Sequence, residues 1–146
     1  MSKRFTLAEA QRLLPRVERL MRDALARKGE YERAERAIRS FTERVMMMGG
    51  MNVDRDQARE ARQRRDTAAQ NLREAIEQVQ ELGCVVKDLD TGLVDFPTRF
   101  RGVEVYLCWR MGERSIEFWH GVDEGFRGRK AIDEDFRKHH EGEPEQ

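Results

Sequence analysis

The chain has 146 residues, the length of about one domain, which argues against a two-domain enzyme. Charged and apolar residues each make up 38% of it, so helices with wide solvated faces are expected. The net charge is zero. Residues 1–83 contain 18 Lys and Arg against 14 Asp and Glu, and residues 84–146 contain 10 against 14. This charge distribution is too even to indicate nucleic-acid binding.

Apolar residues recur at heptad spacing from Thr6 onward, which predicts one long helix packed along a second. One heptad position holds Ala10, Val17, Ala24, Tyr31, Ile38 and Val45, and the other holds Leu13, Leu20, Ala34, Phe41 and Met48. Thr6 and Glu9 form a capping-box pattern at the start of this helix, and Gly49-Gly50 should end it. Pro15 should kink the first turns, because it cannot donate a hydrogen bond to the carbonyl of Gln11.

A second helix is expected from Asp54 to Gly83, where Asp54 and Gln57 repeat the capping pattern. Its apolar seam is mostly alanine, which permits close approach of a partner helix. Residues 6–82 are therefore predicted to form an antiparallel helical hairpin, with helices roughly 60 Å and roughly 43 Å long. The segment from Thr6 to about Leu20 overhangs the shorter helix, so either the C-terminal region or another subunit must cover it.

After Gly83 the apolar period changes from 3.6 to 2, which predicts a small antiparallel sheet of about four strands over residues 84–120. The expected strands are Cys84–Asp88, Leu93–Phe96, Val103–Arg110 and Ser115–His120. Asp90-Thr91-Gly92 should form the first turn, with Gly92 in the left-handed conformation. Pro97 should end the second strand or place it at an edge of the sheet.

The third strand should turn Val103, Val105, Leu107 and Trp109 to the core, and Ile116 and Phe118 join them if Arg110 lies opposite Ser115. The other face then collects Glu104, Tyr106, Cys108, Arg110, Glu117 and Trp119. Glycines indicate an irregular loop over residues 121–132, and residues 133–146 are expected to be a disordered charged tail. The predicted fold class is α+β, with one domain over residues 6–132.

Four segments carry a family resemblance. They are Phe5-Thr6-Leu7-Ala8-Glu9-Ala10 with Leu13-Leu14-Pro15; Gly83-Cys84-Val85-Val86-Lys87-Asp88-Leu89-Asp90-Thr91-Gly92-Leu93-Val94-Asp95-Phe96-Pro97; Val105-Tyr106-Leu107-Cys108-Trp109-Arg110-Met111-Gly112-Glu113; and Phe118-Trp119-His120 followed by Gly125-Phe126-Arg127-Gly128-Arg129. Together they resemble a bacterial family known as domain of unknown function 2203, over residues 5 to about 132. The resemblance implies no activity and no catalytic residues, because the family is named for lacking an assigned function.

Three carboxylates, Asp88, Asp90 and Asp95, surround the first tight turn of the predicted sheet. They could converge on a hard cation or share a proton, or they could be turn residues at a solvated sheet edge. Leu89-Asp90-Thr91-Gly92 also matches the aspartic-protease signature. We set a protease aside, because helices precede this motif and only 54 residues follow it.

His120 is the only histidine outside the tail. It could be a metal ligand or a general base oriented by Glu104 or Asp95, or a hydrogen-bonded structural residue. Aromatic and charged residues nearby could line a ligand pocket, cover the helical overhang or form a subunit interface. The candidate ligand-binding residues are Asp88, Asp90, Asp95, Glu104, Tyr106, Arg110, Trp119 and His120; no catalytic set, metal site or cofactor is identified.

Met46, Met47, Met48 and Met51 form an apolar cluster at the hairpin turn, which suits adaptable contact with a protein partner. The thin alanine seam predicts a homodimer of hairpins. Neither the cysteine spacing nor the N-terminal sequence indicates secretion, and no apolar run approaches the ~20 residues of a membrane span, so a cytoplasmic protein is expected. The leading functional hypothesis is a non-catalytic homodimeric interaction or assembly module. The rival is a small-ligand- or metal-binding protein, with hydrolysis as an open variant, whose site lies at the sheet end.

Overall fold

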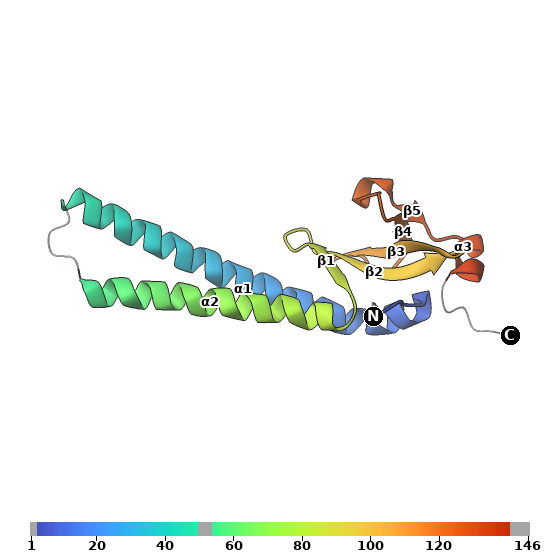
Figure 1. Cartoon of the computed structure of the whole chain (residues 1–146), viewed down its shortest axis with the longest axis horizontal. Coiled ribbons are helices and arrows are strands. Elements are labelled where there is room, and N and C mark those ends of the chain that lie inside the picture. The colour runs from blue at the N-terminus through green and yellow to red at the C-terminus, as the bar shows by residue number, and fades with distance from the viewer. Residues whose placement is uncertain (1–2, 50–53, 141–146) are drawn as a thin grey trace.

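The computed structural model describes residues 3–49 and 54–140. Its elements are α1 (Leu7–Met47), α2 (Arg55–Glu81), β1 (Val85–Asp88), β2 (Leu93–Phe100), β3 (Val103–Arg110), β4 (Phe118–Gly121), the 3-10 turn η1 (Phe126–Gly128), β5 (Lys130–Ala131) and α3 (Glu134–His139). The helical hairpin projects far beyond the sheet, which packs on the N-terminal part of α1 (Figure 1). The predicted α+β fold is confirmed, with five strands in the sheet instead of four.

Local hydrogen bonds fix the starts of both long helices as the sequence predicts. The Thr6 hydroxyl accepts the Glu9 N–H at 2.9 Å, and the Glu9 carboxylate accepts the Thr6 N–H at 2.8 Å. Asp54 caps α2 by accepting the Gln57 N–H at 3.0 Å. Within residues 3–49 and 54–140, no helix is both long and apolar enough to cross a membrane.

α1 continues as one helix through Pro15 to Met47, so the proline does not interrupt it. Its buried residues differ in part from the expected heptad: they are Leu7, Ala10, Leu14, Val17, Met21 and Ala24. Leu13 and Leu20 are only partly buried against the same core. The buried face is wider than a coiled-coil seam, because this part of α1 packs against the sheet as well as beside α2.

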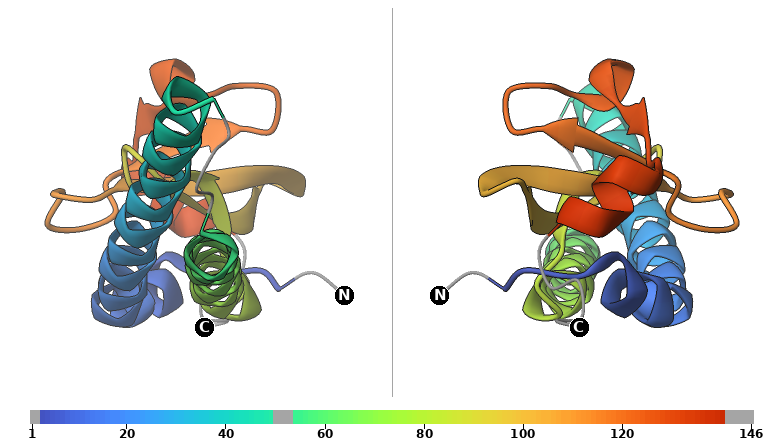
Figure 2. Two further views of the ribbon diagram at one scale, coloured as in Figure 1. Left: turned by 90° about the vertical axis from the view of Figure 1, so that its left-hand side faces the viewer. Right: turned by 90° about the vertical axis from the view of Figure 1, so that its right-hand side faces the viewer.

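The sheet is an antiparallel meander in the order β1-β2-β3-β4-β5, and it lies on one side of the two helices (Figure 2). Its inner face packs on the overhang of α1 and contributes Val94, Phe96, Val105, Leu107 and Trp109 to the core. The Gln11 side chain pairs with the backbone of Ile116, donating to its carbonyl at 3.2 Å and accepting its N–H at 3.1 Å. The C-terminal region of the chain therefore covers the overhang, which was one of the two expected alternatives, the other being another subunit.

β2 continues through Pro97 to Phe100, so this proline does not end the strand. It lies beyond the last pair that β1 makes with β2, between Val85 and Asp95. On the side left free there, the Phe5 N–H donates to the Pro97 carbonyl at 2.8 Å. Pro97 thus occupies a local edge of the sheet, where its missing N–H costs no ladder hydrogen bond.

The register between β3 and β4 differs by one residue from the expected pairing. Phe118 lies opposite Cys108, and His120 lies opposite Tyr106. Because side chains alternate between the faces of a strand, this shift moves Phe118 off the core face and brings Trp119 onto it. Ile116 is buried in the core as expected, although it lies before β4 begins.

Residues 133–140 depart from the expected disordered tail and form α3 with its caps. Asp133 accepts the Phe136 N–H at 2.8 Å. The Phe136 ring is fully buried and stacks on Trp119, with ring centroids 4.9 Å apart. The His140 Nε2 atom accepts the Leu7 N–H at 3.0 Å, so this segment also anchors the start of α1. Residues 141–146 lie outside the described part of the chain.

Replacing Phe136 with alanine should lower the free energy of unfolding by about 3–5 kcal/mol, because a buried aromatic ring is removed from the core. Urea unfolding of the variant, followed by tryptophan fluorescence, measures this loss. Arg137→Ala, one residue along α3 and exposed, is the control and should change stability by less than about 0.5 kcal/mol. Equal stability of the two variants would mean that α3 does not dock in solution.

Candidate functional site

The outer face of the sheet, opposite the core, contains a buried polar cluster from three adjacent strands. Asp95 on β2 lies directly opposite Cys108 on β3, and His120 on β4 lies opposite the next outward residue of β3, Tyr106. Asp95 and Cys108 have no exposed surface, and His120 is 3% exposed. Backbone register, and not a flexible loop, therefore holds these three polar side chains together.

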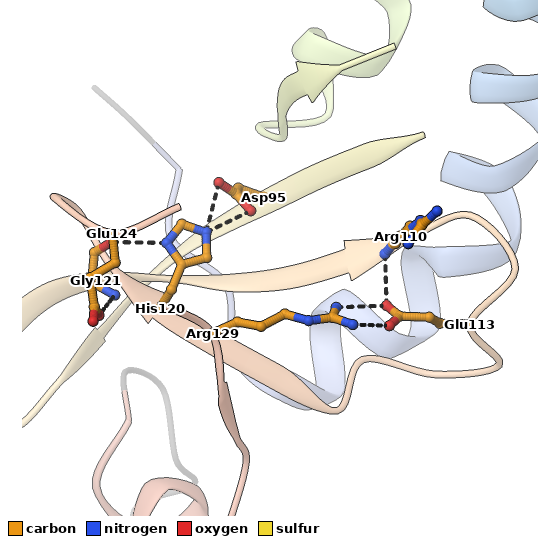
Figure 3. A network of polar contacts seen from close by, with 7 residues as sticks. All are labelled: Asp95, Arg110, Glu113, His120, Gly121, Glu124 and Arg129. Atoms are coloured by element: carbon orange, nitrogen blue, oxygen red, sulfur yellow. Dashed lines mark hydrogen bonds and ion pairs between the residues drawn. The ribbon is translucent and has the colours of Figure 1, made fainter. Parts of the chain in front are cut away.

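His120 and Asp95 share a proton. The His120 Nδ1 atom lies 2.8 Å from the Gly121 carbonyl oxygen, which can only accept, so Nδ1 carries a hydrogen. The Nε2 atom lies 3.1 Å from both carboxylate oxygens of Asp95 (Figure 3). A neutral ring would present a lone pair to an ionised carboxylate here, so either Nε2 is protonated or Asp95 is. Burial raises the pKa of Asp95, while the charge of His120 and its hydrogen bond oppose this rise.

Cys108, directly opposite Asp95 on β3, brings its thiol close to both Asp95 and His120. Burial raises the pKa of its thiol to about 11, and the negative charge of Asp95 adds to the rise. The thiol is therefore protonated near neutral pH, and its sulfur lies within 4.8 Å of an Asp95 carboxylate oxygen. A cysteine nucleophile needs a thiolate and an adjacent base. In this cluster the thiol is protonated and the Nε2 atom of His120 faces the Asp95 carboxylate, so the cluster presents no thiolate with a base beside it.

Arg129, just before β5, connects this cluster to the turn between β3 and β4. It donates to both carboxylate oxygens of Glu113, at 2.6 and 3.2 Å, and its positive charge acts on the Cys108 thiol. The guanidinium lies between the rings of Phe118 and Phe126, 3.9 and 4.1 Å from their centroids. These contacts hold Arg129 over the outer face and balance its charge with Glu113 (Figure 3).

The structure separates the three carboxylates that surround the first turn. Asp88 accepts the Asp90 N–H at 3.0 Å, an ordinary turn contact. The Asp90 side chain is 68% exposed and pairs with Lys28 on α1. Asp95 alone of the three lies inside the sheet. The Asp90 carboxylate of the aspartic-protease signature is therefore paired with a lysine, and the neighbouring Asp88 carboxylate is engaged by the turn backbone.

The remaining candidates are dispersed around the sheet. Glu104 is exposed and does not orient His120, whose partner is Asp95. The Tyr106 ring lies 5.6 Å from the His120 ring, centroid to centroid. Arg110 lies over the ring of Phe126, and Trp119 faces the core. Of the eight candidate ligand-binding residues, the structure brings together Asp95, Tyr106 and His120.

Cys108 and Glu113 were not among the candidates, and Arg129 was considered only as one of the charged residues near a possible ligand pocket. The strand alternation already placed Cys108 on the same face as Tyr106. The missing information was the pairing of β2 with β3, which sets Cys108 directly opposite Asp95. No local sequence signal indicates the contact between Arg129 and Glu113, which are 16 residues apart.

The outer end of the hairpin forms a second candidate surface. Met46, Met47 and Met48 are 73%, 87% and 51% exposed, as expected for the apolar tip. Met51, the fourth methionine of the predicted cluster, lies outside the described residues. A groove between the helices near this end is lined by Ile38, Phe41, Thr42, Val45, Met46, Ala58, Ala61, Arg62 and Arg65.

Neither cysteine should react with a thiol reagent while the protein is folded. Burial raises the pKa of Cys84 to about 12 and that of Cys108 to about 11, so very little thiolate exists near neutral pH. Absorbance of a chromogenic disulfide reagent measures the rate, and the same protein in urea supplies the control in which both thiols react. Rapid labelling of one thiol in the folded protein would contradict its buried placement.

Comparison with known proteins identifies a family but no characterised relative. A family described as "Uncharacterized conserved protein (DUF2203)" matches residues 3–132. No curated protein and no solved structure matches the chain. The matched range includes the whole buried cluster with Arg129 and Glu113, as well as the hairpin. The chain therefore belongs to the family of domain of unknown function 2203.

Proposed function

We propose that this protein is a non-catalytic homodimeric assembly module, whose subunits join through the outer half of the helical hairpin. The supporting observation is that the outer half of the hairpin buries none of its described residues. No residue of α1 beyond Ala24 is buried, and no residue of α2 before Ala68 is buried. Apolar residues nevertheless continue at heptad spacing along α1 to Met48. A helix pair that keeps an apolar seam without burying it is suited to further helices.

The residues of this seam are half-buried, since each helix covers only one side of the other. On α1 they are Tyr31, Ile38, Phe41 and Val45, and on α2 they include Ala58 and Ala61. The groove near the tip exposes Ile38, Phe41 and Val45 along one side of the hairpin. The outer half of a second hairpin laid in this groove would complete a four-helix bundle, in which these side chains face one another.

The charges beside the seam permit two copies to approach. Basic and acidic residues alternate on both helices, as in the pairs of Arg27 with Glu30 and of Glu60 with Arg64. No block of like charge runs along the outer half, so self-association brings no large repulsion. Residues of this kind remain at the solvated rim when an apolar seam is buried.

The chemistry of the sheet end supports a non-catalytic role. Cys108 is a protonated thiol, the Asp90 carboxylate is exposed and paired with Lys28, and His120 is held by Asp95 and Gly121. Both cysteines are free, which supports the proposal of a reducing, cytoplasmic location. The methionine tip, Met46 to Met48, offers a separate adaptable surface for a protein partner.

The wild-type protein should sediment as a dimer at micromolar concentration, and Phe41→Glu should shift it to a monomer, because a charge enters the shared seam. Ser40→Glu adds the same charge one position away, on the exposed side of α1, and should leave the dimer intact. Sedimentation equilibrium of the three proteins measures the association. A wild-type monomer at tens of micromolar, or equal dissociation of both variants, would contradict the proposed interface.

Replacing Met46, Met47 and Met48 together with serine should leave the melting temperature and the dimer unchanged, because these side chains are exposed. The same replacement should remove the partner protein that binds the tip in a pull-down from the native cell. Thermal unfolding and sedimentation supply the controls. An unchanged set of bound proteins would exclude the tip as a partner site.

A further inference from the structure

The buried cluster on the outer face of the sheet brings together three side-chain atoms of types that bind metal ions. Asp95, Cys108 and His120 each offer one potential ligand atom, and these atoms all lie within 4.8 Å of one another. They are a carboxylate oxygen, a sulfur and an imidazole nitrogen. Three different strands supply them, and all three residues are buried.

We propose that Asp95, Cys108 and His120 form a binding site for a divalent transition metal ion of the zinc class. Zinc binds oxygen, nitrogen and sulfur ligands in tetrahedral geometry, and sites with three protein ligands leave the fourth position to water or a small ligand. The mixed donor set with a thiolate excludes calcium and magnesium as the preferred ions, since these bind oxygen.

The distance between His120 and Asp95 fits coordination of a common ion. Two ligands that each lie 2.0–2.1 Å from a tetrahedral zinc ion are separated by about 3.3 Å. The observed separation of Nε2 from each carboxylate oxygen is 3.1 Å. A metal ion can therefore take the place of the shared proton after only small movements of the Asp95 and His120 side chains. The Cys108 thiolate would then complete the set of three ligands from β3.

The surroundings of His120 are those of a metal-binding imidazole. Its Nδ1–H donates to the Gly121 carbonyl at 2.8 Å, so Nε2, which faces Asp95, is the ring atom that can bind a metal ion once the shared proton is displaced. Contacts of this kind orient metal-bound histidines and raise their basicity.

The charges also balance when an ion is bound. Binding of Zn²⁺ displaces two protons, the thiol proton of Cys108 and the proton shared by Asp95 and His120. The product contains one dication, one thiolate and one carboxylate, and is neutral overall, as a buried site requires. Arg129 adds no net charge beside the site, because the Glu113 carboxylate, which accepts two hydrogen bonds from its guanidinium, balances its positive charge.

Cobalt(II) titration tests this site, because a thiolate bound to Co²⁺ produces a charge-transfer absorption that oxygen and nitrogen ligands do not. The protein, prepared without a histidine tag and stripped of metal by chelator, should bind one Co²⁺ per chain with this band, and Zn²⁺ should displace it. Zinc in tenfold excess over protein should also raise the melting temperature. Absence of a stoichiometric band, with no effect of zinc on the melting temperature, would overturn the proposal.

Variants locate the ion. Cys108→Ser should abolish the charge-transfer band, and Asp95→Asn and His120→Ala should each weaken Co²⁺ binding by at least tenfold. Cys84→Ser is the matched control, since Cys84 is the other buried free cysteine, and this variant should keep the band and the affinity. Binding that survives Asp95→Asn and His120→Ala together would place the ion elsewhere, for example at His139 or His140, and would refute the site. The wild-type titration decides the proposal even if one of the variants does not fold.

Discussion

The unequal length of the two long helices is the constraint on which the rest of the structure depends. α1 has 41 residues and α2 has 27, so the first turns of α1 have no helical partner along the hairpin. The inner face of the sheet covers this overhang, and buried side chains from both elements form one core. Gln11 fixes the alignment, because its amide group pairs with both backbone groups of Ile116 just before β4. The sheet is thus oriented by the helix on which it packs.

Orientation of the inner face determines what lies on the outer face. Once Leu107 and Trp119 face the helices, Cys108 and His120 must point outward, since neighbouring residues of a strand alternate between faces. The outer face is then closed by Arg129 and its aromatic neighbours. A single shift of β4 by one residue would put His120 in the apolar core and break its contact with Asp95.

Features set by neighbouring residues could be predicted from the sequence, and features set by distant ones could not. Thr6 with Glu9 and Asp54 with Gln57 mark helix starts through contacts three residues apart, and Gly92 has the expected positive φ of 70°. The register of β4 escaped prediction because it depends on Gln11, 105 residues away from Ile116.

The same distinction applies to α3 and to the buried cluster. The six residues of α3 are too few for a stable isolated helix, so α3 depends on the docking of Phe136 against Trp119. For the cluster, Asp95 and His120 were identified as candidates by residue type. Cys108 was not, since its significance comes from a partner on another strand.

The hydrogen bond between Leu7 and His140 has a consequence for folding order. Its partners are 133 residues apart in the chain, and closing a loop of that length from an open chain costs on the order of 4 kcal/mol of entropy. This contact therefore forms after the hairpin and the meander have already drawn the two segments together. During synthesis, the apolar side of the first turns of α1 stays uncovered until the strands that pack on it have left the ribosome, which makes this segment a natural point of contact for a chaperone.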